Sequence, residues 1–517
     1  MHGLNGVDEM ASSKLCAPLV SLQLRMPAES DVPTMSSSTR EKLLKLALLP
    51  LSAALVAALG CTSSPVSTGT QTQTAAPSGP AFLVGTDAPL ASVVSFQVQL
   101  ESVELTDASG NTVNLLSGPT IVDFARYNGL QGLVDMNDVT AGTYTGVAIQ
   151  LGTATIGYLN TTATPPSITT ETATLTTQTV NIVLNHPLTV VSKTAGGAPV
   201  GLRMDFDLAS SIQTSGGAIT GTVDPTFDVT TVARTDQGAH IDEFIAAVVT
   251  APSGATEPSS FVIEGPHGRQ FTIDTTSSTE WDGSASLGSL NTNSIVAVAG
   301  QFDPADQTLD ADEVAVLSDK GFYAGGLVTY VTPSSGAASS LDFYVRGVLP
   351  DSTAAQLGDI AQVNLTGNET YGIYWMHNAF TELLFNSSAL TPGQEITVGG
   401  QASAETNLNA LTVDRIHLHA WGYNGTIVAG SENPGQGTFK MTVKGFAGVV
   451  VPSTVTVYLG PACDFRYGLG AFTDLTDGVS VRVVGLLLKN SANGQLVLLA
   501  RHIDGLTLSD TTVAAWQ

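Results

Sequence analysis

One short pattern, two apolar residues at alternate positions and then a glycine, recurs along the second half of this chain. Its first mark occurs at Phe261-x-Ile263-x-Gly265, Phe343-x-Val345-x-Gly347 and Met441-x-Val443-x-Gly445. Its second mark occurs at Val296-x-Val298-x-Gly300, Ile396-x-Val398-x-Gly400 and Val481-x-Val483-x-Gly485. Corresponding glycines lie roughly 80 to 100 residues apart, which indicates three copies of one folding unit. Because alternation is typical of strands and glycine of sharp strand bends, each copy predicts a small barrel of about five strands.

The composition of the chain also favours β-structure. Only 12% of the 517 residues are charged, 43% are hydrophobic, and 52 are glycine. Long helices depend on charged residues and alanine, whereas chains rich in Thr, Val and Gly are typical of sheets. Ahead of the repeats, short alternating segments between Val93 and Val229 predict a sandwich of antiparallel strands. The predicted fold class is therefore all-β, with an N-terminal β-sandwich followed by three tandem small β-barrels.

Changes of composition and pattern divide the chain into successive segments. They are an upstream leader ahead of the true start of translation (1–34), a signal peptide (35–60), a flexible tether (61–80), the sandwich (81–236) and the barrel repeats (241–318, 320–419 and 420–510). The tether has no apolar periodicity and cannot bury enough surface to fold. Residues 1–34 carry mixed charges that do not suit a signal peptide, so translation is predicted to begin at Met35, with Met26 as the alternative.

Three motifs of the sandwich segment support a resemblance to a known family. They are Thr86-Asp87-Ala88-Pro89, Ala141-Gly142-x-Tyr144 and Asp205-Phe206-Asp207. Residues 80–235 thereby resemble an uncharacterised domain family of bacterial lipoproteins, which implies a surface lipoprotein domain without an assigned activity. The repeats resemble a second uncharacterised family, OB-like barrels of secreted bacterial proteins. Some OB barrels bind oligonucleotides or sugars, but a fold does not determine a function.

Cys61 follows a segment with the features of a secretory signal. An apolar run from Leu46 to Gly60 is preceded by basic residues and is shorter than the roughly 20 residues that span a bilayer. The end of this run resembles the lipobox of bacterial lipoproteins, which implies cleavage before Cys61 and a diacylglycerol on its thiol. Thr62, rather than Asp, at the next position implies the outer membrane, with the folded part facing the periplasm or the exterior. The alternative is a membrane-anchor helix in which Cys61 is incidental.

Charge and cysteine content exclude some partners and cross-links. A net charge of −26 at pH 7 opposes binding to nucleic acid, whose phosphates require basic patches. It also opposes adhesion to anionic lipid beyond the acyl anchor itself. With Cys61 acylated, Cys463 has no cysteine left to pair with in the mature chain. The domains must therefore be held by their cores, and Cys463 is predicted to be a structural thiol packed near one of them.

Two groups of residues have the chemistry of metal ligands. His417 and His419 are predicted to share one face of a strand, but zinc needs a further ligand, so an exposed polar face is favoured. An acidic segment offers oxygen ligands for calcium at Asp303, Asp306, Asp310 and Asp312. It lacks the spacing of an EF-hand, so a solvated loop is favoured and no cofactor is predicted, with calcium as the alternative.

Aromatic residues gather in the insertion that lengthens the second repeat. They are Tyr371, Tyr374, Trp375 and Phe380, with His377 between them. Aromatic faces stack on sugar rings or on partner proteins, so this segment is the predicted ligand-binding surface. The alternative is a buried cap over the end of the barrel.

The function predicted from these features is a non-catalytic one. The sequence contains no nucleophile elbow, phosphate loop, HExxH or dinucleotide fingerprint. Asp205 and Asp207 share one face of a predicted strand, where a hydrogen-bonding structural role is favoured over a hydrolytic carboxylate pair. We expect a membrane-anchored envelope lipoprotein that binds a glycan or an envelope protein or spaces it from the membrane, and no enzyme. The alternative is a carbohydrate-active or other hydrolytic enzyme whose site is assembled from distant residues.

Overall fold

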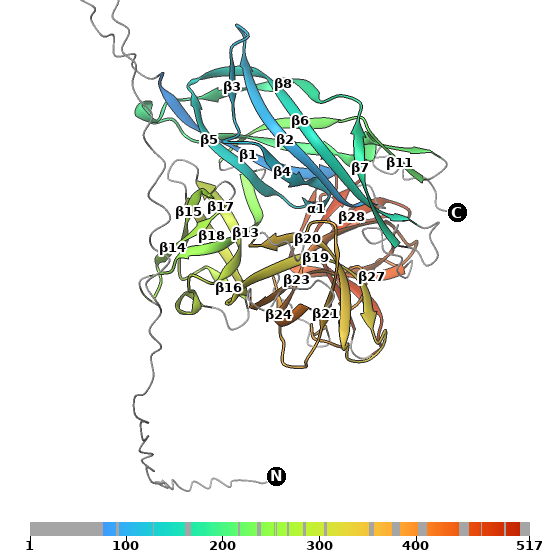
Figure 1. Ribbon diagram of the computed structural model, residues 1–517. Coiled ribbons are helices and arrows are strands. Elements are labelled where there is room, and N and C mark those ends of the chain that lie inside the picture. Colours follow the sequence, from blue (N-terminus) through green and yellow to red (C-terminus); the bar gives the residue numbers. More distant parts are fainter. Residues whose placement is uncertain are drawn as a thin grey trace, which may run out of the picture. The chain divides into compact units, whose positions relative to one another are not determined.

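The structure, a computed structural model, describes residues 76–506 with short gaps. The gaps are 89–92, 128, 161–166, 216–217, 235–238, 253, 255, 266–267, 283–285, 304–307, 351–355, 375–382, 402–410, 444–453, 467 and 491–492. Nearly all regular structure is β-strand, which confirms the predicted fold class (Figure 1). Within the described part of the chain, no helix has the length and apolar character needed to cross a membrane.

Two sheets form the N-terminal sandwich. The first has the order β12-β9-β1-β5 and contains β1 (Ser78–Ala88), β5 (Gly132–Thr140), β9 (Val200–Asp207) and β12 (Phe227–Ala233). The second has the order β10-β11-β7-β6-β2-β3, with β4 also paired to β2 and β8 to β6. Its strands are β2 (Val93–Asp107), β3 (Thr112–Asn114), β4 (Thr120–Asp123), β6 (Gly142–Asn160), β7 (Ser167–Leu175), β8 (Thr179–Val190), β10 (Ile212–Ser215) and β11 (Ala218–Val223). Two short helices, α1 (Phe124–Tyr127) and α2 (Leu208–Ser211), follow β4 and β9.

The sandwich core is made by the inward-facing residues of both sheets. Apolar residues alternate with polar ones along β2 and β9, so one face of each strand is buried. Three rings lie at its centre, with Phe206 4.8 Å from Phe96 and 5.2 Å from Phe124 between ring centroids. Because Phe124 begins α1, this packing fixes the position of the helix and of the side chains that follow it.

Each sequence repeat forms one barrel. Barrel 1 consists of β13 (His240–Thr250), β14 (Ser259–Glu264), β15 (Gln270–Thr275), β16 (Glu280–Trp281), β17 (Ile295–Asp303) and β18 (Thr308–Ser318). Barrel 2 consists of β19 (Gly321–Thr332), β20 (Ser340–Leu349), β21 (Ile360–Asn364), β22 (Thr370–Ile373), β23 (Glu395–Gln401) and β24 (Leu411–His419). Barrel 3 consists of β25 (Trp421–Ile427), β26 (Thr438–Val443), β27 (Thr454–Arg466), β28 (Ser480–Lys489) and β29 (Leu496–Gly505).

The three barrels have the same connectivity. In barrel 3 the closed order is β25-β26-β27-β29-β28, so the first strand pairs with both the second and the fourth. Barrels 1 and 2 repeat this order and close through the pairs β15–β18 and β21–β24, with β16 and β22 added beside their last strands. This is the arrangement expected of OB-like barrels, in which every long strand is paired on both sides.

The second glycine of each repeat lies at a strand irregularity. The register between the last two strands of each barrel shifts at Gly300 in β17, at Gly400 in β23 and at Gly485 in β28. A Cβ atom at Gly485 would collide with the main-chain carbonyl of Leu499. The glycine therefore lets two strands approach where the barrel bends, as the repeat pattern predicts.

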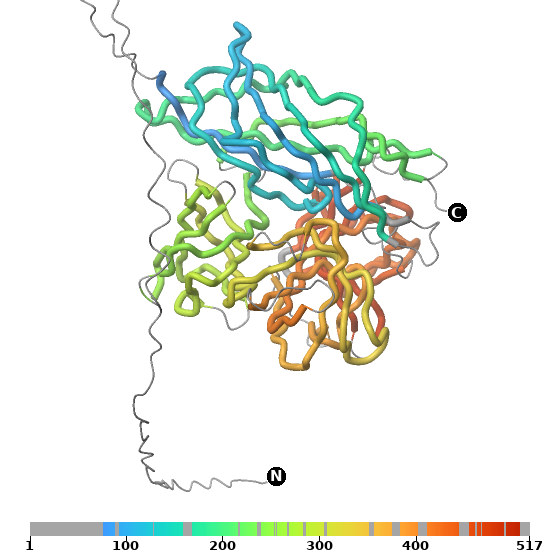
Figure 2. The backbone as a smooth tube through the Cα atoms, viewed as in Figure 1, coloured from blue at the N-terminus to red at the C-terminus, as the bar shows by residue number. Residues whose placement is uncertain are grey.

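Apolar side chains connect the sandwich and the barrels. Phe82 and Val84, on the face of β1 that points away from the sandwich core, pack with the core of barrel 1. Tyr323 of barrel 2 packs with apolar residues of barrel 1, and Leu486 and Leu499 of barrel 3 pack with the core of barrel 2. Figure 2 traces the backbone through the sandwich and then through the barrels in chain order. These shared cores give residues far apart in the sequence fixed positions beside one another.

Candidate functional site

Of the aromatic residues predicted to form a binding surface in barrel 2, Tyr374 is buried. Tyr374 is 3% exposed, and its hydroxyl donates a hydrogen bond of 3.3 Å to the main-chain carbonyl of Asp242 in barrel 1. Tyr371 is half-buried, with the centre of its ring 5.7 Å from the centre of the Phe385 ring. Tyr374 therefore lies in the contact with barrel 1, because β22 pairs with β24 and carries this ring there, and ligand binding by the aromatic segment stays a prediction. Trp375 and Phe380 lie outside the described residues.

His417 and His419 share one strand face, as their spacing predicts, but that face is buried. They are 5% and 3% exposed, so the prediction of an exposed polar face is wrong. His417 Nε2 lies 2.8 Å from Asp282 Oδ2, and His419 Nδ1 lies 2.7 Å from Glu243 Oε1. Both acidic partners belong to barrel 1, so the histidine face of β24 is a contact between two barrels. Sequence alone gives the common face but not the element that covers it.

The acidic residues of barrel 1 are dispersed. Asp303 forms an ion pair with Arg234, whereas Asp310 and Asp312 are exposed on β18. Asp312 Oδ2 lies 3.2 Å from His240 Nε2, and Asp306 lies outside the described residues. Within the described ranges, no three His, Cys, Asp or Glu side chains are grouped so that they could hold a metal ion.

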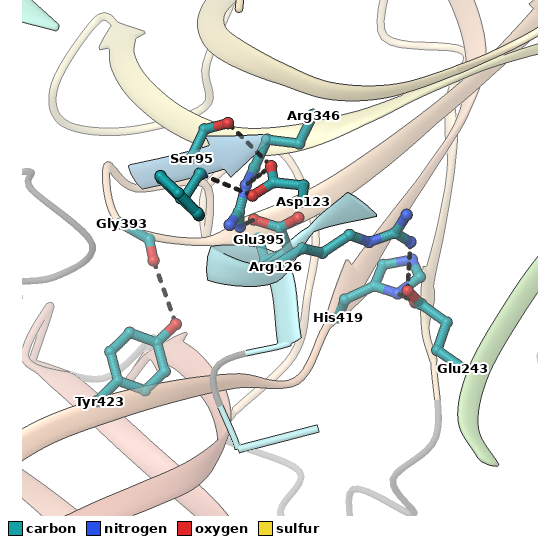
Figure 3. Close-up of polar contacts among 10 residues, drawn as sticks. Ser95, Asp123, Arg126, Glu243, Arg346, Gly393, Glu395, His419 and Tyr423 are labelled. Atoms are coloured by element: carbon teal, nitrogen blue, oxygen red, sulfur yellow. Dashed lines mark hydrogen bonds and ion pairs between the residues drawn. The ribbon is translucent and has the colours of Figure 1, made fainter. Parts of the chain in front are cut away.

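Charged side chains instead converge where the sandwich meets the barrels, in an arrangement we call the junction cluster (Figure 3). Its members are Asp123, Arg126, Glu243, Arg346, Glu395, His419 and Trp421. They come from the sandwich and from all three barrels. The cluster therefore assembles only when the four domains are in contact.

Glu243 holds three of these domains together. One of its carboxylate oxygens forms an ion pair with Arg126 of α1, and the other contacts His419 of β24. Burial alone would raise the pKa of Glu243, but the charge of Arg126 and the contact with His419 outweigh it and lower the pKa to about 2. The carboxylate is thus ionised and has a partner on each oxygen.

Arg346 has the same role on the other side of the cluster. Its side chain is 1% exposed and lies 3.1 Å from Glu395 Oε2 in barrel 2 and 3.7 Å from Asp123 Oδ2 in the sandwich. Its guanidinium carbon lies 4.0 Å from the centre of the Trp421 ring in barrel 3, a cation–π contact. Asp123 also accepts hydrogen bonds from the Ser95 hydroxyl and the Phe96 amide. One buried cation therefore has neighbours from three domains.

Local backbone features direct these side chains into the cluster. The register of β13 and β17 shifts between Ile241 and Phe244, which is a β-bulge. A bulge breaks the alternation of faces, so Asp242 and Glu243 are both shielded from solvent. The sequence signal for the cluster is a charged residue within an otherwise apolar strand, as at Glu243 and Arg346, and sequence reasoning missed it.

One chain of hydrogen bonds has the order found in hydrolytic triads. Thr397 Oγ1 lies 3.1 Å from His419 Nε2, and His419 Nδ1 lies 2.7 Å from Glu243 Oε1. Thr397 is only 3% exposed, and the cavity beside it has a volume of about 10 Å³, which is enough for one water molecule. A neighbouring cavity of about 110 Å³ is lined by Arg126, Gln131 and Phe244 but not by Thr397.

A second polar contact joins barrel 3 to barrel 1. Arg501 lies 3.2 Å from Asp242, which is also 3.5 Å from His240. Burial lowers the pKa of Arg501 to about 9, although Asp242 opposes the shift. Burial opposes protonation of His240, but its hydrogen bonds with Asp242 and Asp312 raise its pKa to about 9. Asp242, like Glu243, thus serves as an anion between domains.

Comparisons with known proteins identify one domain of the chain. No curated protein matches it. Among solved structures it is similar to "drosophila Unr CSD456", with 12% sequence identity and a TM-score of 0.13. The match covers 52% of this chain and 98% of that chain. We infer neither fold nor function from a TM-score this low. Residues 83–222 match a family described as "Domain of unknown function (DUF4382)". The N-terminal sandwich of this chain therefore contains a DUF4382 domain, which confirms the resemblance to an uncharacterised domain.

Proposed function

We propose that this protein is a non-catalytic, lipid-anchored lipoprotein of the bacterial cell envelope, whose sandwich and barrels act together as one rigid spacer. The observation that carries the proposal is the junction cluster, in which Glu243 contacts the sandwich and barrel 2 at the same time. Its charged groups form ion pairs across domain boundaries beside a cavity of about 10 Å³. Such an arrangement favours a fixed geometry of domains over the binding of a substrate.

The anchor is supported by the sequence alone. Cys61 follows a short apolar run, and the segment 62–80 after it has the composition of a flexible tether. A lipid at Cys61 would attach the folded unit to the outer membrane through about 15 residues of tether, since β1 already begins at Ser78. The high negative charge keeps such a unit soluble beside the membrane.

The anchor is tested by substitution of its cysteine. In bacteria grown with labelled palmitate, the wild-type chain is expected to take up label and to sediment with membranes. Cys61→Ser should abolish both, whereas Cys463→Ser, the matched control, should leave both unchanged. Label retained in Cys61→Ser would contradict the lipoprotein assignment.

The rigid spacer is tested by distances between spin labels. In a Cys61→Ser, Cys463→Ser background, cysteines at exposed Ser109 of the sandwich and exposed Gln436 of barrel 3 provide the label sites. A single narrow distance distribution is expected, and Glu243→Ala should broaden it because Arg126 and His419 lose their common partner. A broad distribution in the unsubstituted protein would refute the spacer.

A hydrolytic enzyme is the second candidate, favoured by the order Thr397–His419–Glu243. A fluorophosphonate, which labels activated hydroxyl nucleophiles, distinguishes it from the spacer. The spacer predicts no label on Thr397 and loss of stability in His419→Ala. Labelling that Thr397→Val removes would establish the enzyme instead.

A further inference from the structure

The first and third DUF4382 motifs lie side by side in the first sheet of the sandwich. Strands β1 and β9 are parallel neighbours, with Thr86 beside Asp205, Asp87 beside Phe206 and Ala88 beside Asp207. Asp87 thus lies at the same end of this sheet as Asp205 and Asp207, which are more than 100 residues away in the sequence. No part of the junction cluster uses them.

This end of the sheet holds one deeply buried carboxylate, that of Asp87. Asp87 is 1% exposed, and among the described residues neither of its carboxylate oxygens has a side-chain hydrogen-bond partner. Asp205 Oδ2 lies 3.8 Å from Arg203 Nη2, and Asp207 Oδ1 accepts a hydrogen bond from the Ser210 amide. Burial and then the neighbouring charge of Asp205 raise the pKa of Asp87, while Arg482 and a hydrogen bond from the Leu208 amide oppose the rise. Because a buried carboxylate without an ion-pair partner is costly, Asp87 favours a cation beside it.

A cation reaches this site from another domain. Arg482 of β28, in barrel 3, is 8% exposed, and its Nη1 lies 3.5 Å from the main-chain carbonyl of Asp87 and 4.0 Å from Asp504 Oδ2. Its Nε lies 3.4 Å from Asn424 Oδ1, a neighbour within barrel 3. The positive charge of Arg482 lowers the pKa of Asp87 and Asp504 against the larger effect of burial, and for Asp205 it adds to the larger effect of Arg203.

The backbone of the sandwich is shaped to admit this side chain. Gly129, which follows α1, has a φ of 82°, and a Cβ there would lie 3.1 Å from Arg482 Cδ and 2.6 Å from Val484 Cγ2. Only a residue without a side chain allows this contact. His502 is fully buried nearby, but burial and adjacent arginines lower its pKa to about 3, so it is neutral and does not supply the charge.

We propose that the paired motif ends of the DUF4382 sandwich, Asp87 with Asp205 and Asp207, form a docking site for a guanidinium group, filled here by Arg482 of barrel 3. The kind of partner this surface fits is thus an arginine presented by a β-barrel strand. The planar guanidinium can donate to the Asp87 carbonyl and face several carboxylates at once, which an ammonium group does less well. This proposal is independent of the lipid anchor and of the spacer role.

The test is chemical rescue of a full-length variant without this arginine. In Arg482→Ala, hydrogen exchange of the amides in β28 and at the motif end of β1 is expected to accelerate about tenfold or more, because buried carboxylates lose their cation. Guanidinium chloride at about 20 mM, far below denaturing concentrations, should restore most of the protection, whereas sodium chloride at the same concentration should not. Lys440→Ala, which removes an exposed charge from the same barrel, is the matched control and should behave like wild type.

Two further variants keep the proposal testable if Arg482→Ala does not fold. Arg482→Lys retains the charge but not the planar donor set, and should show intermediate protection. Asp205→Asn combined with Arg482→Lys should have less than the summed effect of the two changes, because each removes part of one interaction. Wild-type protection in Arg482→Lys, equal rescue by sodium and guanidinium, or additive effects would each overturn the docking site.

Discussion

At the scale of single residues, the buried charges of this protein have partners in other domains. Arg346 lies between Glu395, Asp123 and the Trp421 ring, and Asp242 lies between His240 and Arg501. A buried ion pair adds little net stability over an apolar pair, but loss of one partner leaves an uncompensated charge. Separation of two domains at such a residue would therefore leave a buried charge without its partner, which disfavours partly opened contacts.

Replacement of Arg346 by alanine should be strongly destabilising. Glu395 and Asp123 would be left as buried anions without their cation, and we expect the free energy of unfolding to fall by about 3–5 kcal/mol. Denaturant unfolding followed by intrinsic fluorescence measures this change. Lys440→Ala, at an exposed position, should stay within about 0.5 kcal/mol of wild type. Equal effects of the two substitutions would mean that the junction cluster does not contribute to the free energy of unfolding.

His240 should make stability depend on pH at neutral and alkaline values. Its pKa rises from 6.5 to about 9 on folding, through its hydrogen bonds with Asp242 and Asp312 and against burial. A raised pKa stabilises the fold fully below pH 6.5 and loses that effect as pH rises through about 9. His240→Asn should therefore be less stable than wild type at pH 6.5, and the difference in free energy of unfolding should shrink as the pH is raised to 10. The same change at exposed His186 should give no such trend.

At the scale of strands, the repeated glycines mark the bends of the barrels. Gly485→Ala would place a methyl group against the Leu499 carbonyl, and neither main chain can move without breaking the β28–β29 ladder. We expect a loss of about 1–3 kcal/mol, the usual cost of overpacking. Gly435→Ala, in a turn of the same barrel where the nearest atom is 3.6 Å from the new Cβ, should change stability by less than about 0.5 kcal/mol. A calorimetric melt of both variants tests the contrast.

The strands could be predicted from the sequence because their signals are local. The marks ending at Gly300 and Gly485 predicted both a strand and its bend, and the three motifs predicted an uncharacterised domain that the family match confirms. The contacts between domains could not be predicted this way. His417 and His419 were placed on one face, but whether that face meets water or barrel 1 depends on how separate units pack. The burial of Tyr374 could not be predicted for the same reason, since the residues that cover it come from another repeat.

At the scale of the whole molecule, the junction cluster links folding of the domains to one another. Glu243 contacts α1 of the sandwich and β24 of barrel 2 while its own strand belongs to barrel 1. Because the apolar clusters also cross the domain boundaries, no single barrel presents a complete surface by itself. Loss of the Glu243 contacts should therefore loosen all three domains together.

The pH dependence of this coupling gives a test of the junction. Folding lowers the pKa of Glu243 from 4.5 to about 2, because Arg126 and His419 outweigh the effect of burial. A lowered pKa stabilises the folded protein fully above pH 4.5, and this contribution is lost as pH falls through about 2. For a shift of this size the contribution is roughly 3 kcal/mol. Glu243→Gln, which keeps the shape but not the charge, should therefore be less stable than wild type at pH 7, with the difference shrinking toward pH 2.

Glu264→Gln is the matched control, since Glu264 is exposed on β14 of the same barrel. Its stability should follow that of wild type at every pH. Comparison with this control separates the effect of Glu243 from the general effect of acid on a chain of net charge −26. Limited proteolysis at pH 7 adds a readout of geometry, because Glu243→Gln should expose the connections between domains to cleavage while the barrels themselves stay resistant. If Glu243→Gln and Glu264→Gln have the same pH profile and the same cleavage pattern, Glu243 does not couple the domains and the rigid spacer loses its main support.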